Sequence, residues 1–177
     1  MDAFLEHIVN APKTYNTPNA RRGSFIPSVI NSFKLSNYFK NVAIRPGKPV
    51  LFAKIKGKEK VIFGLPGNPI SSAACFRFFV YPFIEYILKL DAEKPLKAIL
   101  KNSFDKKKNF TRFVKSKLST TKNGKIEVEV LQGQESFRIK SFVKSNSWSL
   151  MPAGKSRFKK GDIIDCFFIN TPNQNIS

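Results

Sequence analysis

The sequence predicts a protein of two parts, an α/β segment followed by a small all-β domain. The stretch "VIFGLPGNPISSAACFRFF" (residues 61–79) runs from an apolar strand through a Pro-Gly-Asn-Pro corner into a helical pattern. After residue 95 the chain changes to short alternating runs separated by turn residues, which is typical of a β-barrel or sandwich. The segment "DAEKP" marks the change. We therefore expect an N-terminal segment whose structure the pattern does not define (1–35), part of an α/β domain (36–92) and a β-barrel domain (95–172).

Three apolar runs in the first part are predicted strands. They are "FKNVAI", "VLFAKI" and "KVIFGL", with "RPGKP" and "KGKE" as the loop and the turn between them. Asn68 is a good N-cap, and Pro69 suits the first position of the helix that follows. Apolar residues then recur at helical spacing as far as Leu88, and Pro82 should kink the helix because it lacks a backbone N–H. Strands followed by a helix favour an α/β sheet, of which this chain holds only a part.

The second part is predicted from a series of β-like runs. Asn123-Gly124 indicates a hairpin between two of them, and Lys160-Gly161-Asp162 marks a turn into the last strand. The runs are "NFTRFVKSKLST", "KIEVEVL", "FRIKSFV", "SWSLMP" and "DIIDCFFI". Strands at this spacing predict a small barrel or sandwich.

The charge of the chain indicates an anionic partner. Lys and Arg number 31 against 12 Asp and Glu in 177 residues, a formal net charge of +19. A charge of this size is typical of proteins that bind nucleic acid, phosphorylated ligands, oxyanions or acidic membranes, and a merely solvated surface is the alternative. Trp148 and the Phe-rich barrel could stack on single-stranded nucleic acid, but most Phe residues alternate with polar ones, which favours a core.

The same composition argues against several other classes. His7 is the single histidine, so a His-based triad or metal site has little material, and we expect no metal-ligand set. Cys75 and Cys166 lie far apart without a CxxC motif, which favours buried thiols in a reduced, cytoplasmic compartment. The N-terminus lacks the basic start and apolar core of a signal peptide. Charged residues and a proline interrupt the apolar stretch 73–88, so we expect no membrane span.

The Pro-Gly-Asn-Pro corner is a candidate anion site. The first turn of a helix presents free backbone N–H groups and the positive end of the helix dipole. Gly67 would let a ligand approach the backbone, and Pro66 and Pro69 would fix the loop. Ser71 would add a hydroxyl donor close to the Asn68 cap. A rigid connection that binds nothing is the alternative.

A second loop, "IRPGKP", precedes the corner in the sequence. Arg45 and Lys48 flank the Pro46-Gly47 turn at the end of a predicted strand, which puts two cations on one loop. Ligands gather at the carboxyl ends of the strands in a parallel sheet, so both loops could face one pocket. Two solvated charges at a turn are the alternative.

The two loops, in this order and spacing, resemble a known family. The stretch "VAIRPGKPVLFAKI…VIFGLPGNPISSAACFRFFVYPFI" is similar to molybdopterin molybdotransferase, the MoeA and gephyrin E-domain family, and the β-rich tail resembles the C-terminal barrel of that family. The resemblance covers roughly residues 36–170. It implies a partial α/β molybdopterin-binding domain followed by a small β-barrel domain. It also implies a partial transferase of molybdenum cofactor biosynthesis, which inserts molybdate into adenylylated molybdopterin.

The resemblance also implies the residues of the site. Arg45 and Lys48 would lie near the pterin phosphate or an oxyanion. Arg112 and Ser136 would bring a cation and a hydroxyl toward molybdate. The two loops would line the same pocket with Pro46, Gly47, Pro66, Gly67, Asn68, Pro69 and Ser71. Mg²⁺ is implied as a cofactor, bound by acidic residues that are not evident in this chain, and a homodimer or a complementing N-terminal chain is implied as the assembly.

The sequence departs from the family in several respects. Family members are much longer, and nothing in residues 1–35 matches the Gly/Ser-rich loop and the acidic residues of their first half. Lys107 and Asn109 stand where the family favours Arg and an acidic residue. The chain therefore carries one part of a bipartite site. Two alternatives stay open, a basic binding module for nucleic acid or another polyanion and a non-catalytic remnant that oligomerises.

Overall fold

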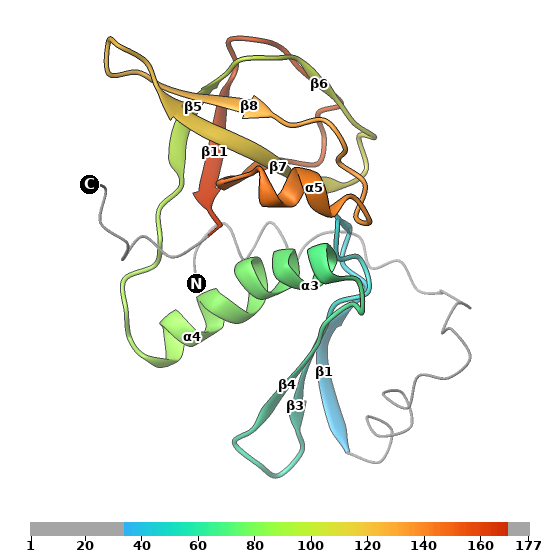
Figure 1. Ribbon diagram of the computed structural model, residues 1–177. Helices are drawn as coiled ribbons and strands as arrows, with labels where there is room; N and C mark the ends of the chain where they lie inside the picture. Colours follow the sequence, from blue (N-terminus) through green and yellow to red (C-terminus); the bar gives the residue numbers. More distant parts are fainter. Residues whose placement is uncertain (1–33, 170–177) are drawn as a thin grey trace.

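The computed structural model describes residues 34–169 of the chain (Figure 1). Most of the predicted N-terminal segment (1–35), including His7, lies outside the described residues, as do residues 170–177. In the described part a helical segment lies between a small sheet and a β-barrel, drawn at the bottom and at the top of Figure 1. The predicted order, a partial α/β unit followed by a small barrel, is confirmed.

Within the described residues, the small sheet has three antiparallel strands in the order β1-β3-β4. They are β1 (Leu35–Lys40), β3 (Leu51–Ile55) and β4 (Val61–Gly64). Phe52 and Phe63 are opposite each other on neighbouring strands and stack with ring centroids 4.6 Å apart. Phe83 of the helical segment packs edge-on against both rings. Since directly opposite residues share a face of the sheet, this aromatic face is the one covered by the helix.

The predicted strand "FKNVAI" is wrong as a single element. β1 ends at Lys40, Asn41 adopts φ = 60°, and the chain forms a new strand, β2 (Ile44–Arg45), in the barrel sheet. Asn tolerates the left-handed region better than most residues, and the N–H of Asn41 donates to the carbonyl of Val50 at 3.1 Å. This bend moves the chain from one sheet to the other.

The helical segment begins where the sequence predicts. It comprises α3 (Pro69–Cys75), the π-helical turn η1 (Phe76–Val80) and α4 (Tyr81–Ile87). The side chain of Asn68 accepts hydrogen bonds from the N–H groups of Ile70 and Ser71, which confirms the predicted N-cap.

The sequence predicts a kink in the helix at Pro82, and the structure has a π-helical turn immediately before this residue. Immediately before Pro82, the N–H of Tyr81 donates to the carbonyl of Phe76, five residues back. Since Pro82 has no N–H to give to the carbonyl four residues back, a wider turn at this point is a physical consequence of its sequence position. No helix of residues 34–169 is long and apolar enough to cross a membrane.

Five strands of the described residues close the barrel. Each pairs with the next in the order β7-β8-β5-β11-β9, and β9 pairs with β7 to complete the ring. The strands are β5 (Leu96–Leu100), β7 (Thr111–Thr120), β8 (Ile126–Val130), β9 (Ser147–Met151) and β11 (Ile163–Phe168). The short strands β6 (Phe104–Asp105) and β10 (Arg157–Phe158) form a separate ribbon. The predicted hairpin is confirmed, because β7 and β8 are antiparallel neighbours and Gly124 lies in the left-handed region.

One of the predicted β runs, "FRIKSFV", is wrong. It contains the short helix α5 (Ile139–Val143), and its alternating apolar residues Phe137, Ile139 and Val143 are exposed. The buried residue is instead Ser141, whose hydroxyl donates to the carbonyls of Gly133 and Arg138 in the preceding loop. In the ring, β5 occupies a place for which the sequence pattern indicated no strand.

Three carboxamide side chains of the described part complete barrel strands where a neighbouring strand is missing. Each accepts a hydrogen bond from the N–H of one residue and donates to the carbonyl of the same residue, as a neighbouring strand would. The pairs are Asn102 with Val130 (2.9 and 3.0 Å), Gln134 with Lys115 (2.9 and 2.7 Å) and Asn146 with Leu118 (2.7 and 3.0 Å). Buried backbone groups are thereby satisfied without further strands.

The helical segment and the barrel share one hydrophobic core. Phe78 of η1 stacks on Phe113 of β7 with ring centroids 3.9 Å apart. The buried Arg77 donates from Nε to the carbonyl of Phe168 at 2.9 Å and forms an ion pair with Glu93. This core fixes the barrel relative to the loops at the start of the helix. The predicted domain boundary between residues 92 and 95 stays a prediction, because the shared core spans it.

Candidate functional site

The "IRPGKP" loop joins the small sheet to the barrel. β2 pairs with β7 in parallel, with Ile44 opposite Thr111 and Arg45 opposite Arg112. The N–H of Thr111 donates to the carbonyl of Ala43 at 3.0 Å. The structure therefore brings together Arg45 and Arg112, which lie far apart in the sequence. We expected the two loops to share a site because both would lie at the carboxyl ends of strands in a parallel sheet. That reason is wrong, because the small sheet is antiparallel.

The Pro46-Gly47 turn of this loop packs against the start of the helix. Gly47 has φ = +107°, and a Cβ added there would overlap Sγ of Cys75 and lie 3.7 Å from the carbonyl oxygen of Ser71. The thiol of Cys75 donates to the carbonyl of Gly47 at 3.6 Å. Burial raises the pKa of this thiol to about 12, so it stays protonated. Only glycine fits this position, where the Pro46-Gly47 turn touches α3.

The start of the helix does not present free backbone donors. Oδ1 of Asn68 accepts from the N–H of Ile70 at 3.1 Å and from the N–H of Ser71 at 3.2 Å. The N–H of Ser72 donates to the carbonyl of Asn68 at 2.8 Å, and Pro69 has no N–H. The expectation of free N–H groups on this turn is therefore wrong, because the N-cap occupies the donors that an anion would need.

The remaining groups of the corner differ in what they can offer. The hydroxyl of Ser71 is used within the cap, where it donates to Oδ1 of Asn68 at 3.4 Å. Gly67 is exposed, and no atom lies within 4 Å of the place that a Cβ would take. Pro66 is half-buried. A ligand can therefore approach the backbone at Gly67, and the roles of Pro66 and Gly67 stay predictions.

Arg45, Lys106 and Arg112 form what we call the cationic cluster. Arg45 lies over the ring of Phe110, 4.9 Å from its centroid, and Arg112 lies over the ring of Phe104 at 5.4 Å. None of the three cations forms an ion pair within residues 34–169. A guanidinium stacked on a ring keeps its N–H groups directed outward at its edge, where an anion can accept them.

The positive charges of the cationic cluster are close enough to lower one another's pKa. Burial lowers the pKa of Arg112, the charge of Arg45 lowers it further, and Glu135 opposes both effects. Burial likewise lowers the pKa of Lys106, and the charge of Arg112 adds to this. Nζ of Lys106 is fixed by the carbonyl of Phe110, to which it donates at 2.7 Å. An anion bound here would relieve the mutual repulsion.

Ser136 lies on the loop after β8. It follows Glu135, whose carboxylate is close enough to Arg112 to raise the pKa of that guanidinium. Ser136 is half-buried, and its hydroxyl has no hydrogen-bond partner in the described part of the chain. Lys48 is half-buried as well and has no ion pair among residues 34–169. Both side chains keep free donors.

The donor set suits an oxyanion. Guanidinium, ammonium and hydroxyl groups all donate hydrogen bonds to tetrahedral anions. Within residues 34–169, no three His, Cys, Asp or Glu side chains converge in a way that could hold a metal ion. Lys106 and Glu135 belong to this site although the sequence did not single them out for it. The sequence showed Lys106 only as one of three consecutive lysines, and Glu135 reaches Arg112 through the tertiary fold.

A separate groove of about 380 Å³ lies between the helical segment and the barrel. It is lined mainly by apolar side chains, among them Phe76, Tyr81 and Trp148. Arg77 also lines it, but its guanidinium already pairs with Glu93. The groove therefore offers no free charge to an anion and is distinct from the cationic cluster.

Comparison with known proteins matches each of the two parts of the chain to a family model. Residues 97–168 match the family model described as MoeA C-terminal region (domain IV). Residues 26–86 match the family model described as "Probable molybdopterin binding domain". The cationic cluster is formed where these two matched regions meet, since Arg45 lies in the second and Arg112 in the first.

Curated relatives cover most of this chain but are much longer. The molybdopterin molybdenumtransferase of Synechococcus elongatus is 32% identical over 141 residues, which are 80% of this chain and 34% of the relative. That of Synechocystis sp. is 33% identical over 144 residues, 81% of this chain and 33% of the relative. That of Staphylococcus epidermidis is 31% identical over 143 residues, again 80% and 33%. The chain thus spans about one third of the length of the curated relatives it matches.

Solved structures agree with the fold. The molybdopterin biosynthesis moeA protein from Pyrococcus horikoshii superposes with a TM-score of 0.61 at 22% identity, over 78% of this chain and 33% of that one. A molybdenum cofactor biosynthesis protein from Pyrococcus furiosus gives a TM-score of 0.61 at 19% identity, over 76% and 45%. At these identities the likeness concerns the fold alone.

Proposed function

We propose that this chain, whose residues 26–86 and 97–168 match a molybdopterin-binding and a MoeA C-terminal family model, is related to the C-terminal portion of the molybdopterin molybdenumtransferases and acts in molybdenum cofactor biosynthesis. The activity we assign is the transfer of molybdate into adenylylated molybdopterin. Because the chain spans about one third of its relatives, it would supply one part of the transferase site. A complementing N-terminal chain would supply the rest, and a homodimer is the alternative assembly.

The observation that carries this proposal is the pairing of Arg45 with Arg112. Like charges opposite each other on neighbouring strands are destabilising, and no carboxylate forms an ion pair with either arginine within the described residues. Such a pair becomes favourable when an anion accepts hydrogen bonds from both guanidinium groups. The two substrates are both anions, since molybdate is a dianion and the pterin carries a phosphate.

The residues divide between the two substrates according to the element that carries them. We assign the phosphate end of adenylylated molybdopterin to Arg45 and Lys48, on the loop that touches the helix. We assign molybdate to Arg112 on the barrel and to the free hydroxyl of Ser136. These groups would neutralise two anions that repel each other and hold them side by side, which is catalysis by positioning and by electrostatic stabilisation. Gly67 would leave room for the ligand at the corner.

Mg²⁺ does not fit the described residues. It prefers carboxylate and water oxygens. Glu135, the carboxylate that raises the pKa of Arg112, forms an ion pair with Arg138 at 3.5 Å, and Asp105, next to Lys106, forms one with Arg157 at 3.8 Å. We therefore derive no step from Mg²⁺.

A cytoplasmic location is part of the same proposal. Cys75 and Cys166 are both free and buried, as expected for a protein of a reducing compartment. Burial raises the pKa of Cys166 to about 11, so this thiol also stays protonated and inert.

Calorimetric titration of molybdate, and then of adenylylated molybdopterin, into the purified chain tests the proposal. We expect Arg112→Ala to weaken molybdate binding and Arg45→Ala to weaken pterin binding, each by about tenfold or more, because each removes a charge-assisted hydrogen bond. Arg157→Ala is the matched control, since Arg157 is exposed and paired only with Asp105 at 3.8 Å. Loss of binding in all three variants alike would contradict a defined site.

The same titration separates the site from a general affinity for polyanions. A basic module for nucleic acid would bind any polyanion, with an affinity that falls steeply as salt rises and that depends little on which cation is removed. Binding of single-stranded DNA that is equal in wild type and in Arg45→Ala, together with no molybdate binding, would favour that alternative.

A further inference from the structure

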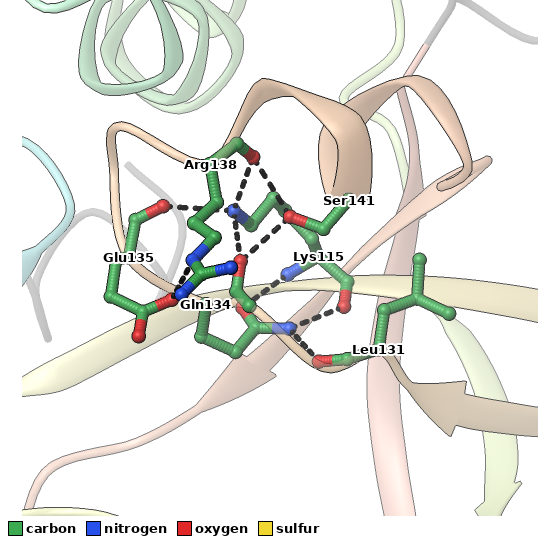
Figure 2. A network of polar contacts seen from close by, with 7 residues as sticks. Lys115, Leu131, Gln134, Glu135, Arg138 and Ser141 are labelled. Atoms are coloured by element: carbon green, nitrogen blue, oxygen red, sulfur yellow. Dashed lines mark hydrogen bonds and ion pairs between the residues drawn. The ribbon is translucent and has the colours of Figure 1, made fainter.

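Lys115 of β7 is a lysine inside the barrel wall. The residue is 1% exposed, and its Nζ donates to three carbonyls of one loop. These are the carbonyls of Gly133 at 2.7 Å, Glu135 at 3.0 Å and Arg138 at 3.2 Å (Figure 2). An ammonium group has three donors, so this contact uses its whole capacity.

Two other side chains fasten the same loop. Gln134 accepts from the N–H of Lys115 and donates to the carbonyls of Lys115 and Leu131, both at 2.7 Å. The hydroxyl of Ser141 donates to the carbonyl of Gly133 at 2.6 Å, one of the carbonyls that Lys115 holds. Figure 2 shows these contacts converging on the inner side of the loop.

Ser136 is the residue that this network leaves free. The carbonyl immediately before it, that of Glu135, is held by Lys115, and so is the carbonyl of Arg138 two residues after it. The hydroxyl of Ser136 itself has no partner in the part of the chain that the structure describes. The inner side of the loop is thus fixed by Lys115, while Ser136, next to the Glu135 that raises the pKa of Arg112, keeps a free donor.

A buried lysine is a poor choice for stability alone. Moving an ammonium group out of water costs free energy, and an apolar side chain of similar size would pack in a barrel wall without that cost. Met or Leu cannot, however, hold three carbonyls at one point. Burial lowers the pKa of Lys115, Glu135 opposes this, and Arg112 and Arg138 add to it. The electrostatic cost indicates a role beyond packing.

We propose that Lys115 is a positioning residue, which fixes the loop 133–138 so that Ser136 completes the oxyanion site with Arg112. The inference rests on the proposed function of that site. Lys115 touches no substrate and acts through the loop carbonyls. This role of Lys115 also explains how the hydroxyl of Ser136 can be held in place without a hydrogen bond of its own.

Three variants and two measurements test this role. Lys115→Met keeps the length of the side chain and removes its donors, whereas Lys115→Arg restores donors. Lys117→Met is the matched control, because Lys117 is exposed on the same strand. The first measurement is amide hydrogen exchange of residues 133–138, and the second is calorimetric titration of molybdate, both at a temperature at which all variants are folded.

We expect Lys115→Met to speed amide exchange in the loop and to weaken molybdate binding, each by about tenfold, because three hydrogen bonds to carbonyls are lost. Lys115→Arg should recover most of both, and Lys117→Met should change neither. A merely structural lysine would change global stability but leave the molybdate affinity of the folded protein unaltered, and that result would overturn the proposal. Unchanged exchange in the loop would overturn it as well.

A second variant keeps the test decisive if Lys115→Met does not fold. Ser141→Ala removes two hydrogen bonds from the same carbonyls with little change in volume, and we expect about threefold weaker molybdate binding. Equal affinity in this variant and in wild type would overturn the proposal. Absence of molybdate binding in wild type would instead overturn the proposed function, and loop exchange would still show whether Lys115 fixes the loop.

Discussion

Arg45 and Arg112 are register partners across the parallel pair β2–β7, so two positively charged residues are neighbours where the chain enters the barrel. The charge of Arg45 lowers the pKa of Arg112 in addition to the lowering by burial. Each arginine rests on its own aromatic ring, and neither has an acidic partner within residues 34–169. The fold therefore holds a repulsive pair in place, which is how a protein prepares a site for an anion.

A double-mutant cycle on Arg45→Gln and Arg112→Gln should reveal this repulsion. Each single substitution also loses a cation–π contact, but the cycle cancels those losses and isolates the pair. We expect an unfavourable coupling of roughly 0.2–1 kcal/mol in urea unfolding at low salt, as for like charges directly opposite on neighbouring strands. The coupling should shrink at high salt because the Debye length falls.

Saturating molybdate should reverse the sign of this coupling. A bound dianion that accepts hydrogen bonds from both arginines makes them mutually dependent, so losing the second would then cost less than losing the first. The measurement is the same cycle of unfolding free energies with molybdate present. A coupling that stays repulsive in molybdate would mean that the anion does not bridge the pair.

Gly47→Ala should destabilise the fold much more than Gly57→Ala. Both glycines have positive φ, +107° and +73°, so both substitutions carry a left-handed backbone cost of about 1–2 kcal/mol. At Gly57 an added Cβ meets nothing within 4 Å, whereas at Gly47 it would overlap Sγ of Cys75 and lie 3.2 Å from Cδ1 of Ile44. We expect a further cost of about 1–3 kcal/mol at Gly47 from overpacking.

Urea unfolding of the two glycine variants measures the difference, and the double variant Gly47→Ala/Cys75→Ala assigns it. Removal of Sγ should return part of the overpacking cost but none of the backbone cost. Equal destabilisation by Gly47→Ala and Gly57→Ala would show that the loop and the helix are not in close contact in solution.

Phe78→Ala should weaken the barrel and the helical segment together. Phe78 is buried against Phe113 of the barrel, so its truncation should cost about 3–5 kcal/mol. Trp148, the single tryptophan, packs edge-on against Phe78 and reports on the barrel by fluorescence. We expect the fluorescence transition and the far-ultraviolet circular dichroism transition to shift together to lower urea.

Phe76→Ala is the control for this prediction, because Phe76 lies in the same π turn but is 48% exposed. It should change stability by less than Phe78→Ala. A Trp148 transition that stays in place in Phe78→Ala while the helical signal moves would mean that the barrel and the helix unfold separately.

The sequence was sufficient to predict those elements that depend on residues close together in the chain. The Asn68 cap, the Asn123-Gly124 hairpin and most barrel strands are confirmed, because each depends on residues that are neighbours in the chain. The run "FKNVAI" could not be divided correctly, since periodicity shows that a segment is extended but not which sheet it joins. The alternating apolar residues of "FRIKSFV" predicted a strand wrongly, because alternation in the sequence does not show whether those side chains are buried.

The candidate site could be predicted only in part. The sequence brought forward Arg45, Arg112 and Ser136 through motif resemblance, and the structure brings Arg112 close both to Arg45 and to the loop of Ser136. The first turn of the helix was misjudged, although the signal was present. A residue that caps a helix uses the same N–H groups that a ligand would need. The role of Lys115 depends on contacts 18 to 23 residues away, which no local pattern carries.

Glu85→Gln should stabilise the protein above about pH 4.5 and not below it. Burial raises the pKa of Glu85 above its ordinary value of 4.5, the charge of Glu93 raises it further, and Arg77 opposes both. A carboxyl whose pKa is raised by folding binds its proton more tightly in the native state. Glu85 therefore costs no stability at a pH below its pKa in the unfolded state. It lowers the free energy of unfolding as the pH rises through its pKa in the folded state.

The glutamine variant lacks this titration, so its advantage over wild type should appear as the pH rises from 4.5 and then stay constant. Urea unfolding of both proteins between pH 4 and pH 8 measures it, with Glu129→Gln, an exposed carboxylate on β8, as the control. A variant that is less stable than wild type at neutral pH would mean that Arg77 depends on Glu85 as well as on Glu93. The ion pair that links the helix to the segment before the barrel would then be a three-residue network with a charged Glu85 at its centre.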